Sequence, residues 1–331
     1  MMNILAGDIG GTKTVLAVFP PGVQPRKPLS EMTFPSARYK SLGDIVTEFL
    51  NAVNMPVDRA CFGVAGPVIA GRAKITNLPW VVDGHALQSA FHWSSIALLN
   101  DLESVAYAIP VLGSEDIHTL SAGVPVREGT IAVLAPGTGL GEGFMTWECG
   151  AYRTHPSEGS HASFAPVGSL QIGLLKYLNT KGFDHVSFER VCSGALGIPN
   201  IYNYLKTTGL EEPAWLAKQL ASSSDPTPVI VSVAHNQART CELAKAVLDM
   251  FVAILGAEAG NLGLKVLSTG GIYLGGGIPP RILTDLQKPV FLDELRKKGR
   301  FCKVLTDMPV HVILNSKAAL MGAAVYGLAE K

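Results

Sequence analysis

Three glycine-rich turns constrain this chain more than any other feature, because each directly follows a short apolar segment of strand type. The segments are Asn3–Ile9 before Gly10-Gly11, residues 131–135 before Pro136-Gly137, and Gly271–Leu274 before Gly275-Gly276-Gly277. Glycine lets backbone N–H groups approach a phosphate without a Cβ in the way. Three such turns at strand ends predict a sheet protein that binds a phosphorylated ligand at the edge of its sheets.

Strand patterns alternate with helical ones along the chain. Leu42, Ile45, Val46 and Phe49 recur at helical spacing, whereas Ser95–Asn100 is a continuous apolar segment typical of a strand. This alternation predicts an α/β fold with mixed sheets flanked by helices. The strand–turn–strand element occurs twice, near residues 8–14 and 136–143. We therefore expect two α/β domains, a small one of residues 1–111 plus 310–331 and a large one of residues 112–309.

Composition narrows the class of partner. Of 331 residues, 47% are hydrophobic and 16% charged, and 27 basic side chains balance 27 acidic ones. A chain without net charge has no overall field to hold nucleic acid or an anionic membrane, so neither is expected as a partner. No basic signal region precedes the first strand, and charged residues interrupt the apolar stretch 246–267, which predicts a buried helix. The five cysteines form no CxxC pair, which favours reduced thiols in a cytoplasm.

The first turn, Gly7-Asp8-Ile9-Gly10-Gly11-Thr12-Lys13-Thr14, comes close to the P-loop pattern, but Thr12 stands where its last glycine belongs. A P-loop opens a helix, whereas residues 14–19 are β-branched and aliphatic and predict a strand. We therefore expect a tight hairpin whose N–H groups face a phosphate, with Asp8 toward the accompanying metal. The alternative is an ordinary hairpin with a turn aspartate.

The other two turns predict a second grip on the same ligand. Pro136-Gly137-Thr138-Gly139-Leu140-Gly141 also joins two strands and does not satisfy the dinucleotide pattern G-x-G-x-x-G. Gly275-Gly276-Gly277 opens a helix that starts with proline, so a flat adenine or ribose can lie against bare backbone there. Taken singly, each of these turns could equally be a structural turn.

Several polar residues are candidates for contact with a polyol. Asp101 follows the strand Ser95–Asn100 and should emerge at the carboxyl edge of the sheet, although the pattern alone favours a cap of the following helix. Glu158 and His161 stand three residues apart in a Gly/Ser loop, and such side chains accept from one hydroxyl and donate to the next. Either could instead be an ordinary surface residue. The pair has no third metal ligand at suitable spacing.

The segments Gly-Asp-Ile-Gly-Gly-Thr, Leu-Asn-Asp, Ala-Pro-Gly-Thr-Gly-Leu-Gly and Gly-Gly-Gly-Ile-Pro-Pro-Arg occur in an order that resembles the sugar-kinase/actin/heat-shock ATPase superfamily. More closely, the chain resembles the bacterial ATP-dependent glucokinase family, from Asp8 to about Gly322. The family's usual Pro-Gly-Glu-Gly-Gly-His is here residues 156–161, Pro-Ser-Glu-Gly-Ser-His, which keeps the functional side chains. The broader ROK sugar kinases share the first turn but usually carry a clustered Cys/His zinc motif, which this chain lacks.

The resemblance implies two ribonuclease H-like (actin-like ATPase) lobes around a cleft, and transfer of the γ-phosphoryl group of ATP to the 6-hydroxyl of D-glucose. It implies ATP with Mg²⁺, a homodimer, and closure of the lobes on the sugar. Asp101 would be the general base. The sugar would be held by Asn100, Asp101, Glu158, His161, Glu189, Asn77 and Gly137. The nucleotide would be held by Asp8, Gly10, Gly11, Thr12, Lys13, Gly137, Thr138, Gly139, Gly275 and Gly276, with Asp8 facing Mg²⁺ indirectly.

Simpler interpretations of two of these residues stay open, because Glu189 could pair with Arg190 or Lys181 and Asn77 precedes a common Leu-Pro turn. Among functions, a chaperone-type or cytoskeletal ATPase would need a long interaction segment. A sugar-responsive repressor would need a DNA-binding module before the first strand. The nearest alternative is a kinase for another hexose or an N-acyl sugar.

Overall fold

The computed structural model describes residues 3–22, 25–75, 78–155 and 157–329. The chain forms two compact units, of which the first comprises Met1–Asp116, Glu148–Pro156 and Asn315–Lys331, and the second Ile117–Trp147 and Ser157–Leu314. The expected division put residues 310–331 in the first domain and ended that domain's leading part at residue 111. The strand Val310–Ile313 instead pairs with two strands of the second unit, and the chain leaves the first unit after Asp116.

The sheet of the first unit has the order β3-β2-β1-β4-β8. Its strands are β1 (Asn3–Ile9), β2 (Lys13–Phe19), β3 (Ser30–Pro35), β4 (Val57–Val64) and β8 (Ser95–Asn100). β1, β4 and β8 run parallel, and β2 and β3 pair antiparallel beside them. The sequence patterns locate β1 and β8 at their observed bounds. A small sheet of β5 (Val68–Ile69), β6 (Arg72–Lys74) and β7 (Val81–Asp83) follows β4.

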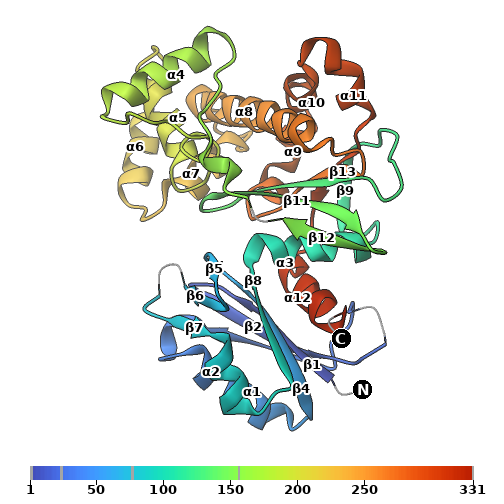
Figure 1. Cartoon of the computed structure of the whole chain (residues 1–331). Helices are drawn as coiled ribbons and strands as arrows, with labels where there is room; N and C mark the ends of the chain where they lie inside the picture. Colours follow the sequence, from blue (N-terminus) through green and yellow to red (C-terminus); the bar gives the residue numbers. More distant parts are fainter. Residues whose placement is uncertain (1–2, 23–24, 76–77, 156, 330–331) are drawn as a thin grey trace. The chain divides into compact units, whose positions relative to one another are not determined.

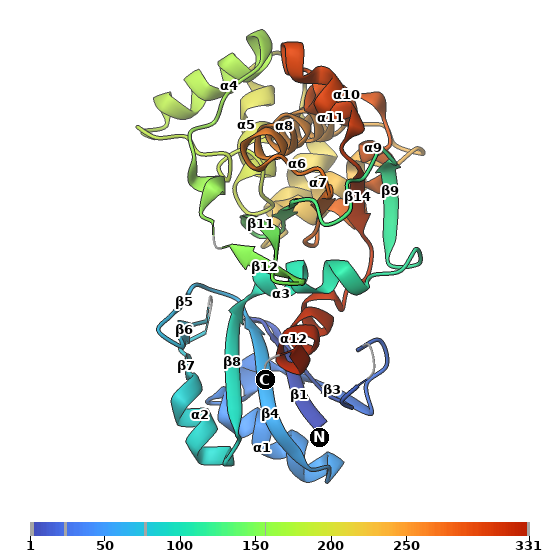
Figure 2. The same cartoon turned by 45° about the vertical axis from the view of Figure 1, so that its right-hand side comes forward.

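Successive side chains of each strand point to opposite faces of this sheet, and both faces are buried. Leu5 and Ile9 of β1 pack with α1 (Leu42–Val53) and α2 (Gly84–Phe91), whereas Ile4 and Ala6 pack with α12 (Ala318–Ala329). Figure 1 and Figure 2 show α12 beside α3 (Asp101–Ala108) on this second face. By the same alternation Asp8, two residues after Ala6, lies on the face that carries α3.

The second unit contains a sheet with the order β11-β10-β13-β14-β9. Its strands are β9 (Ile117–Ser121), β10 (Ile131–Pro136), β11 (Leu140–Glu148), β13 (Gly271–Leu274) and β14 (Val310–Ile313), and β11 leads into β12 (Ala151–His155). β10, β13 and β14 run parallel, so their carboxyl ends lie at one edge.

Helices surround this sheet, and the longest of them, α8 (Glu242–Val266), forms the centre of the core. The others are α4 (Gly168–Thr180), α5 (Gly197–Lys206), α6 (Ala214–Ala221), α7 (Pro226–Ala234), α9 (Leu283–Leu286), α10 (Pro289–Arg296) and α11 (Cys302–Asp307). The first unit has two short 3₁₀ helices, η1 (Ser36–Arg38) and η2 (Ile109–Val111). Those of the second unit are η3 (Gly159–His161), η4 (Pro279–Ile282) and η5 (Gly299–Phe301).

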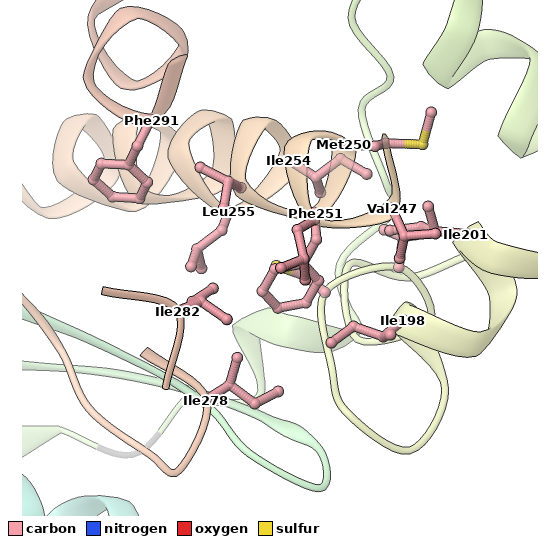
Figure 3. Packing of buried hydrophobic residues seen from close by; sticks show 14 of the residues in the cluster. Ile198, Ile201, Val247, Met250, Phe251, Ile254, Leu255, Ile278, Ile282 and Phe291 are labelled. Carbon is pink, nitrogen blue, oxygen red and sulfur yellow. The ribbon is translucent and has the colours of Figure 1, made fainter. Parts of the chain in front are cut away.

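Figure 3 shows how α8 fills the core of the second unit. Phe251 and Leu255 of α8 lie near Ile278 and Ile282, which follow the third glycine turn, and all four are buried. By length and composition α8 passes as a membrane span, but 78% of its apolar window is buried inside the protein. The prediction of a buried helix is therefore confirmed.

Candidate functional site

Two carboxylates stand at the carboxyl edge of the first unit's sheet. Because β1, β4 and β8 are parallel, Ile9 pairs with Val64 and Val64 with Asn100, and the three strands end together. Asp8 is the second-to-last residue of β1, and Asp101 is the first residue of α3, directly after β8. The sheet thus brings these two predicted site residues, 93 positions apart in sequence, to one edge.

The residue that caps α3 is Asn100, so the interpretation of Asp101 as the helix cap is wrong. Asn100 Oδ1 accepts from the N–H of Leu102 at 2.9 Å, and Glu103 completes a capping box by accepting from the Asn100 N–H at 3.0 Å. The Asn100 amide also donates to Gly66 O at 3.0 Å. Asp101 Oδ1 accepts from the N–H of Leu102 at 2.9 Å, and the Asp101 side chain is exposed.

Electrostatics couple the two carboxylates. Burial and then the charge of Asp101 raise the pKa of Asp8 to about 6, and Lys13 opposes this shift. Desolvation by the surrounding protein raises the pKa of Asp101 as well, and hydrogen bonds to its carboxyl group from Leu102 and Asn100 oppose this shift. Two repelling carboxylates at an open edge fit a cation bound between anionic groups.

The hairpin turn beside Asp8 holds its backbone rigidly. Gly10 N–H donates to Lys13 O at 3.0 Å, and Ser36 donates through Oγ to Gly10 O at 2.7 Å. Within the described residues, the N–H groups of Gly11 and Thr12 donate to no protein acceptor. Free N–H groups in a fixed turn are what a phosphate oxygen needs, and Thr12 and Lys13 are exposed there.

In the second unit the other two glycine turns lie against each other. Gly275 N–H donates to Leu134 O at 2.8 Å and Ile278 N–H to Pro136 O at 3.2 Å. Gly276 has φ +81°, and a Cβ there would lie 2.5 Å from Pro136 O, so only glycine fits. The predicted nucleotide residues Gly137, Thr138, Gly139, Gly275 and Gly276 therefore occupy one edge of the sheet.

Three of the polar residues expected to hold a sugar, Glu158, His161 and Glu189, form one cluster beside these turns. His161 Nε2 lies 3.6 Å from Glu158 Oε2, and His161 Nδ1 lies 3.7 Å from Glu189 Oε2. A Cβ on Gly139 would lie 2.8 Å from Glu189 Oε1, which places this carboxylate next to the second glycine turn. Glu158 and His161 are largely exposed, so their polar atoms are open to a ligand.

The alternative that Glu189 pairs with Arg190 or Lys181 does not match the structure, because both cations lie over aromatic rings. Arg190 stacks on the ring of Phe183 at 4.3 Å and Lys181 lies 5.1 Å from the centre of the Tyr177 ring. Glu189 N–H donates to Ser160 O at 3.0 Å, so its backbone is tied to the turn that carries His161. Asn77, also expected at the sugar, lies outside the described residues.

The structure adds two features that the sequence patterns missed. A pocket of about 160 Å³ adjoins the third glycine turn and is lined by Thr227, Pro228, Val231, Ser232, Ile278 and Arg281. Thr227, Ser232 and Arg281 contribute to the lining, but most of the surface that faces the pocket is apolar, which suits a flat base. The only sequence signal was the Ile-Pro-Pro-Arg that follows the glycines, because α7 comes from a distant part of the chain. The second feature is a buried acid, Glu142 on β11.

Metal ligands are sparse. Among the residues described, no group of three or more His, Cys, Asp or Glu side chains is arranged to hold a metal ion. Mg²⁺ binds through one or two carboxylates together with substrate phosphates rather than in an all-protein cage. The hard oxygen donors Asp8 and Asp101 fit that mode, in which the cation arrives with a polyphosphate.

Comparison with known proteins identifies the family of this chain. The family model described as Glucokinase matches residues 5–330. The glucokinase of Nostoc punctiforme is 40% identical over 339 residues, covering 98% of each chain, and that of Chromobacterium violaceum is 33% identical, covering 97% of this chain and 88% of its own.

Solved structures of glucokinases are also similar to this chain. The crystal structure of a glucokinase from an Antarctic psychrotroph matches with a TM-score of 0.87 at 31% identity, covering 100% of both chains. A ROK family glucokinase from Streptomyces griseus, solved with glucose and AMPPNP, shares the fold with a TM-score of 0.65 at 20% identity, covering 98% of this chain and 99% of its own. The predicted α/β sugar-kinase fold and the resemblance stated above are confirmed. The chain belongs to the glucokinase family.

Proposed function

We propose that this protein is a glucokinase that transfers the γ-phosphoryl group of ATP to the 6-hydroxyl of D-glucose, giving glucose 6-phosphate and ADP. The observation that carries the proposal is the polar cluster of Glu158, His161 and Glu189 beside a pair of facing glycine turns. An ATPase that acts on water has no use for such a cluster. A kinase that acts on a polyol needs such a cluster, because each hydroxyl of the polyol both donates and accepts hydrogen bonds.

In the proposed reaction Asp101 is the general base. It takes the proton of the 6-hydroxyl as the oxygen forms its bond to the γ-phosphorus, the bond from that phosphorus to the β-phosphate oxygen breaks, and ADP leaves. The raised pKa of Asp101 supports this role, because a stronger base accepts the proton more readily at neutral pH. Asn100 fixes the start of α3 and thereby the position of Asp101.

The nucleotide is held by the glycine turns in this proposal. The free N–H groups of Gly11 and Thr12, with Lys13, suit the phosphates, and Thr138 with Gly137 and Gly139 supplies the second grip. The apolar pocket between α7 and Ile278 is of a size for adenine. Mg²⁺ neutralises phosphate charge when bound, with Asp8 facing it through a water or directly.

A homodimer and a cytoplasmic location belong to the same proposal. All five cysteines are free thiols, and Cys149 and Cys302 are exposed, which fits a reducing compartment. Light scattering of the purified protein measures its molar mass and so tests the dimer. A mass of about 70 kDa would support the dimer, and the monomer mass of 35.0 kDa would contradict it.

The test of the function is a coupled assay of ADP release across a panel of sugars with MgATP. We expect glucose to give the highest kcat/KM, above mannose, fructose and N-acetylglucosamine, and no release above background without sugar. Product analysis by NMR should place the phosphate on carbon 6. A higher kcat/KM for another sugar would reassign the substrate, and sugar-independent ADP release would refute a sugar kinase.

A further inference from the structure

Glu142 is an acid buried without a partner directly beneath the candidate sugar site. It lies on β11 with 1% of its surface exposed, and neither carboxyl oxygen has a hydrogen-bond partner. Burying an unpartnered polar group is unfavourable, and burying an unpartnered charge far more so. A side chain in this position needs a reason other than core packing.

The carboxyl group of Glu142 supports the turn η3 that carries His161. A Cβ on Gly159 would lie only 2.6 Å from Glu142 Oε2, so the backbone of the turn rests on this carboxyl group. On its other side the turn is tied by Glu189 N–H to Ser160 O at 3.0 Å and by Phe188 N–H to Ala162 O at 3.1 Å. Glu142 is therefore in contact with the element that places His161 between Glu158 and Glu189.

The groups around Glu142 favour its neutral form. Burial and then the charge of Glu258 on α8 raise the pKa of Glu142 to about 8, against the opposing charge of Lys265. Glu258 is fully buried, accepts from Asn261 at 2.8 Å, and has Lys265 Nζ at 3.5 Å. The Cys192 thiol also faces this space, and burial raises its pKa far above the usual range, so it contributes no charge.

The turn itself is the part that can respond when Glu142 loses its proton. A carboxylate without a partner has to draw in water or move toward solvent. The sheet and α8 on either side of Glu142 are tightly packed core elements, whereas η3 has three residues, of which His161 is exposed. Glu158, which directly precedes the turn, and His161 within it move with it.

We propose that Glu142 is a positioning residue for the sugar site: as a neutral acid it holds the turn Gly159–His161 in place, and its ionisation displaces the turn and weakens sugar binding. This inference rests on the proposed function, because it takes the Glu158–His161–Glu189 cluster as the sugar site. It makes sugar affinity pH-dependent through a residue that does not touch the sugar.

The test is glucose binding by isothermal titration calorimetry from pH 6.5 to 9.5, without nucleotide, for the natural protein and three variants. For the natural protein we expect a constant Kd up to about pH 7.5 and an increase approaching tenfold per pH unit above about pH 8. Glu142→Gln keeps the neutral shape and should bind glucose with a constant Kd. In Glu258→Gln the repulsion on Glu142 is gone, so the increase should begin at lower pH.

The matched control is Glu294→Gln on α10, another glutamate with a buried oxygen that lacks a hydrogen-bond partner. It should keep the natural pH profile. A merely structural role for Glu142 would lower the melting temperature of Glu142→Gln without changing the pH dependence of Kd. If Glu142→Gln does not fold, the displaced onset in Glu258→Gln decides the question.

Two results would overturn the inference while leaving the proposed function intact. One is a Kd for glucose in the natural protein that stays constant from pH 7 to 9.5. The other is an unchanged alkaline increase in folded Glu142→Gln. Absence of glucose binding at every pH would instead refute the proposed function, and this inference with it.

Discussion

The negative charge of Asp101 raises the pKa of Asp8, although the two residues are 93 positions apart and β8, which Asp101 follows, is not a neighbour of β1. The intervening strand β4 ends at Val64 and is followed by the small residues Ala65 and Gly66. Parallel pairing alone brings the two carboxylates to this edge. In the proposed function the pair serves two roles, because Asp8 faces the cation and Asp101 is the base.

The coupling predicts how nucleotide binding depends on pH. Asp8 has a pKa raised to about 6, so its charge is present above this pH and is lost as pH falls through it. Binding of MgADP should therefore weaken below about pH 6. In Asp101→Asn the repelling charge is gone, the pKa of Asp8 is lower, and the weakening should begin at lower pH.

Calorimetric titration of MgADP between pH 5 and 8 measures this displacement. Glu48→Gln, which removes an exposed acid of α1, serves as the control and should keep the natural profile. An onset at the same pH in Asp101→Asn and in the natural protein would show that the two carboxylates are not coupled.

Gly139 provides a test of the sugar cluster that leaves every polar side chain in place. A Cβ at this position would lie 2.8 Å from Glu189 Oε1, so Gly139→Ala should push this carboxylate away from His161. We expect the KM for glucose to rise about tenfold or more, whereas the melting temperature should change little. Gly43→Ala on α1, where a Cβ meets only ordinary contacts, is the control. An unchanged KM in Gly139→Ala would separate Glu189 from sugar binding.

The apolar pocket next to Ile278 predicts where the adenine ring lies. Ser232 lines this pocket and is exposed, so Ser232→Trp should fill the space without disturbing the core. The KM for ATP should rise about tenfold or more while the Kd for glucose stays the same. Ser222→Trp at the end of α6 is a surface control for the added indole. Equal KM values for ATP in Ser232→Trp and the natural protein would place the base elsewhere.

The sequence predicts some helices and strands of the fold and misses others. β1 and β8 are found at their observed bounds because an apolar segment bounded by turn residues is an unambiguous strand signal. α7 is missed, since its sequence Pro-Thr-Pro-Val-Ile-Val resembles an extended segment more than a helix. It is helical because Asp225 caps it, its prolines fall in the first turn, and Ile230 and Val231 pack in the core.

Some features of the candidate site can likewise be predicted from the sequence, and others cannot. The pairing of the second and third glycine turns follows from parallel strands, so strand ends suffice to predict it. Glu142 could not be predicted, because Gly141-Glu142-Gly143 looks like part of an exposed turn. Only the register of β11, which pairs Glu142 with Leu134, together with its burial beside Glu258, shows that its side chain is in the core.

The burial of Glu142 also predicts a pH-dependent stability. Its pKa is raised from 4.5 to about 8, so the folded state holds the proton more tightly than the unfolded state between these values. The free energy of unfolding therefore falls as pH rises from about 5 to 8 and levels off above. Glu142→Gln does not titrate, so its stability relative to the natural protein should increase over this interval by on the order of 3 kcal/mol, at about 1.4 kcal/mol per pH unit.

Urea unfolding at pH 5, 6.5 and 8 provides this measurement. Glu294→Gln is again the control, and its difference from the natural protein should vary little with pH. A difference between Glu142→Gln and the natural protein that is constant from pH 5 to 8 would mean that Glu142 is ionised in the folded state throughout.

The central claim is that the Asp101 carboxylate removes the proton from the sugar hydroxyl as phosphate is transferred. Asp101→Asn keeps the shape and the acceptor for the Leu102 N–H but cannot act as a base. The most direct measurement is the single-turnover rate of glucose 6-phosphate formation at pH 8 with saturating glucose and MgATP. We predict a loss of about 10²- to 10⁴-fold in Asp101→Asn, with the Kd values for glucose and MgADP within a few-fold of natural. A rate within threefold of the natural protein would contradict the account.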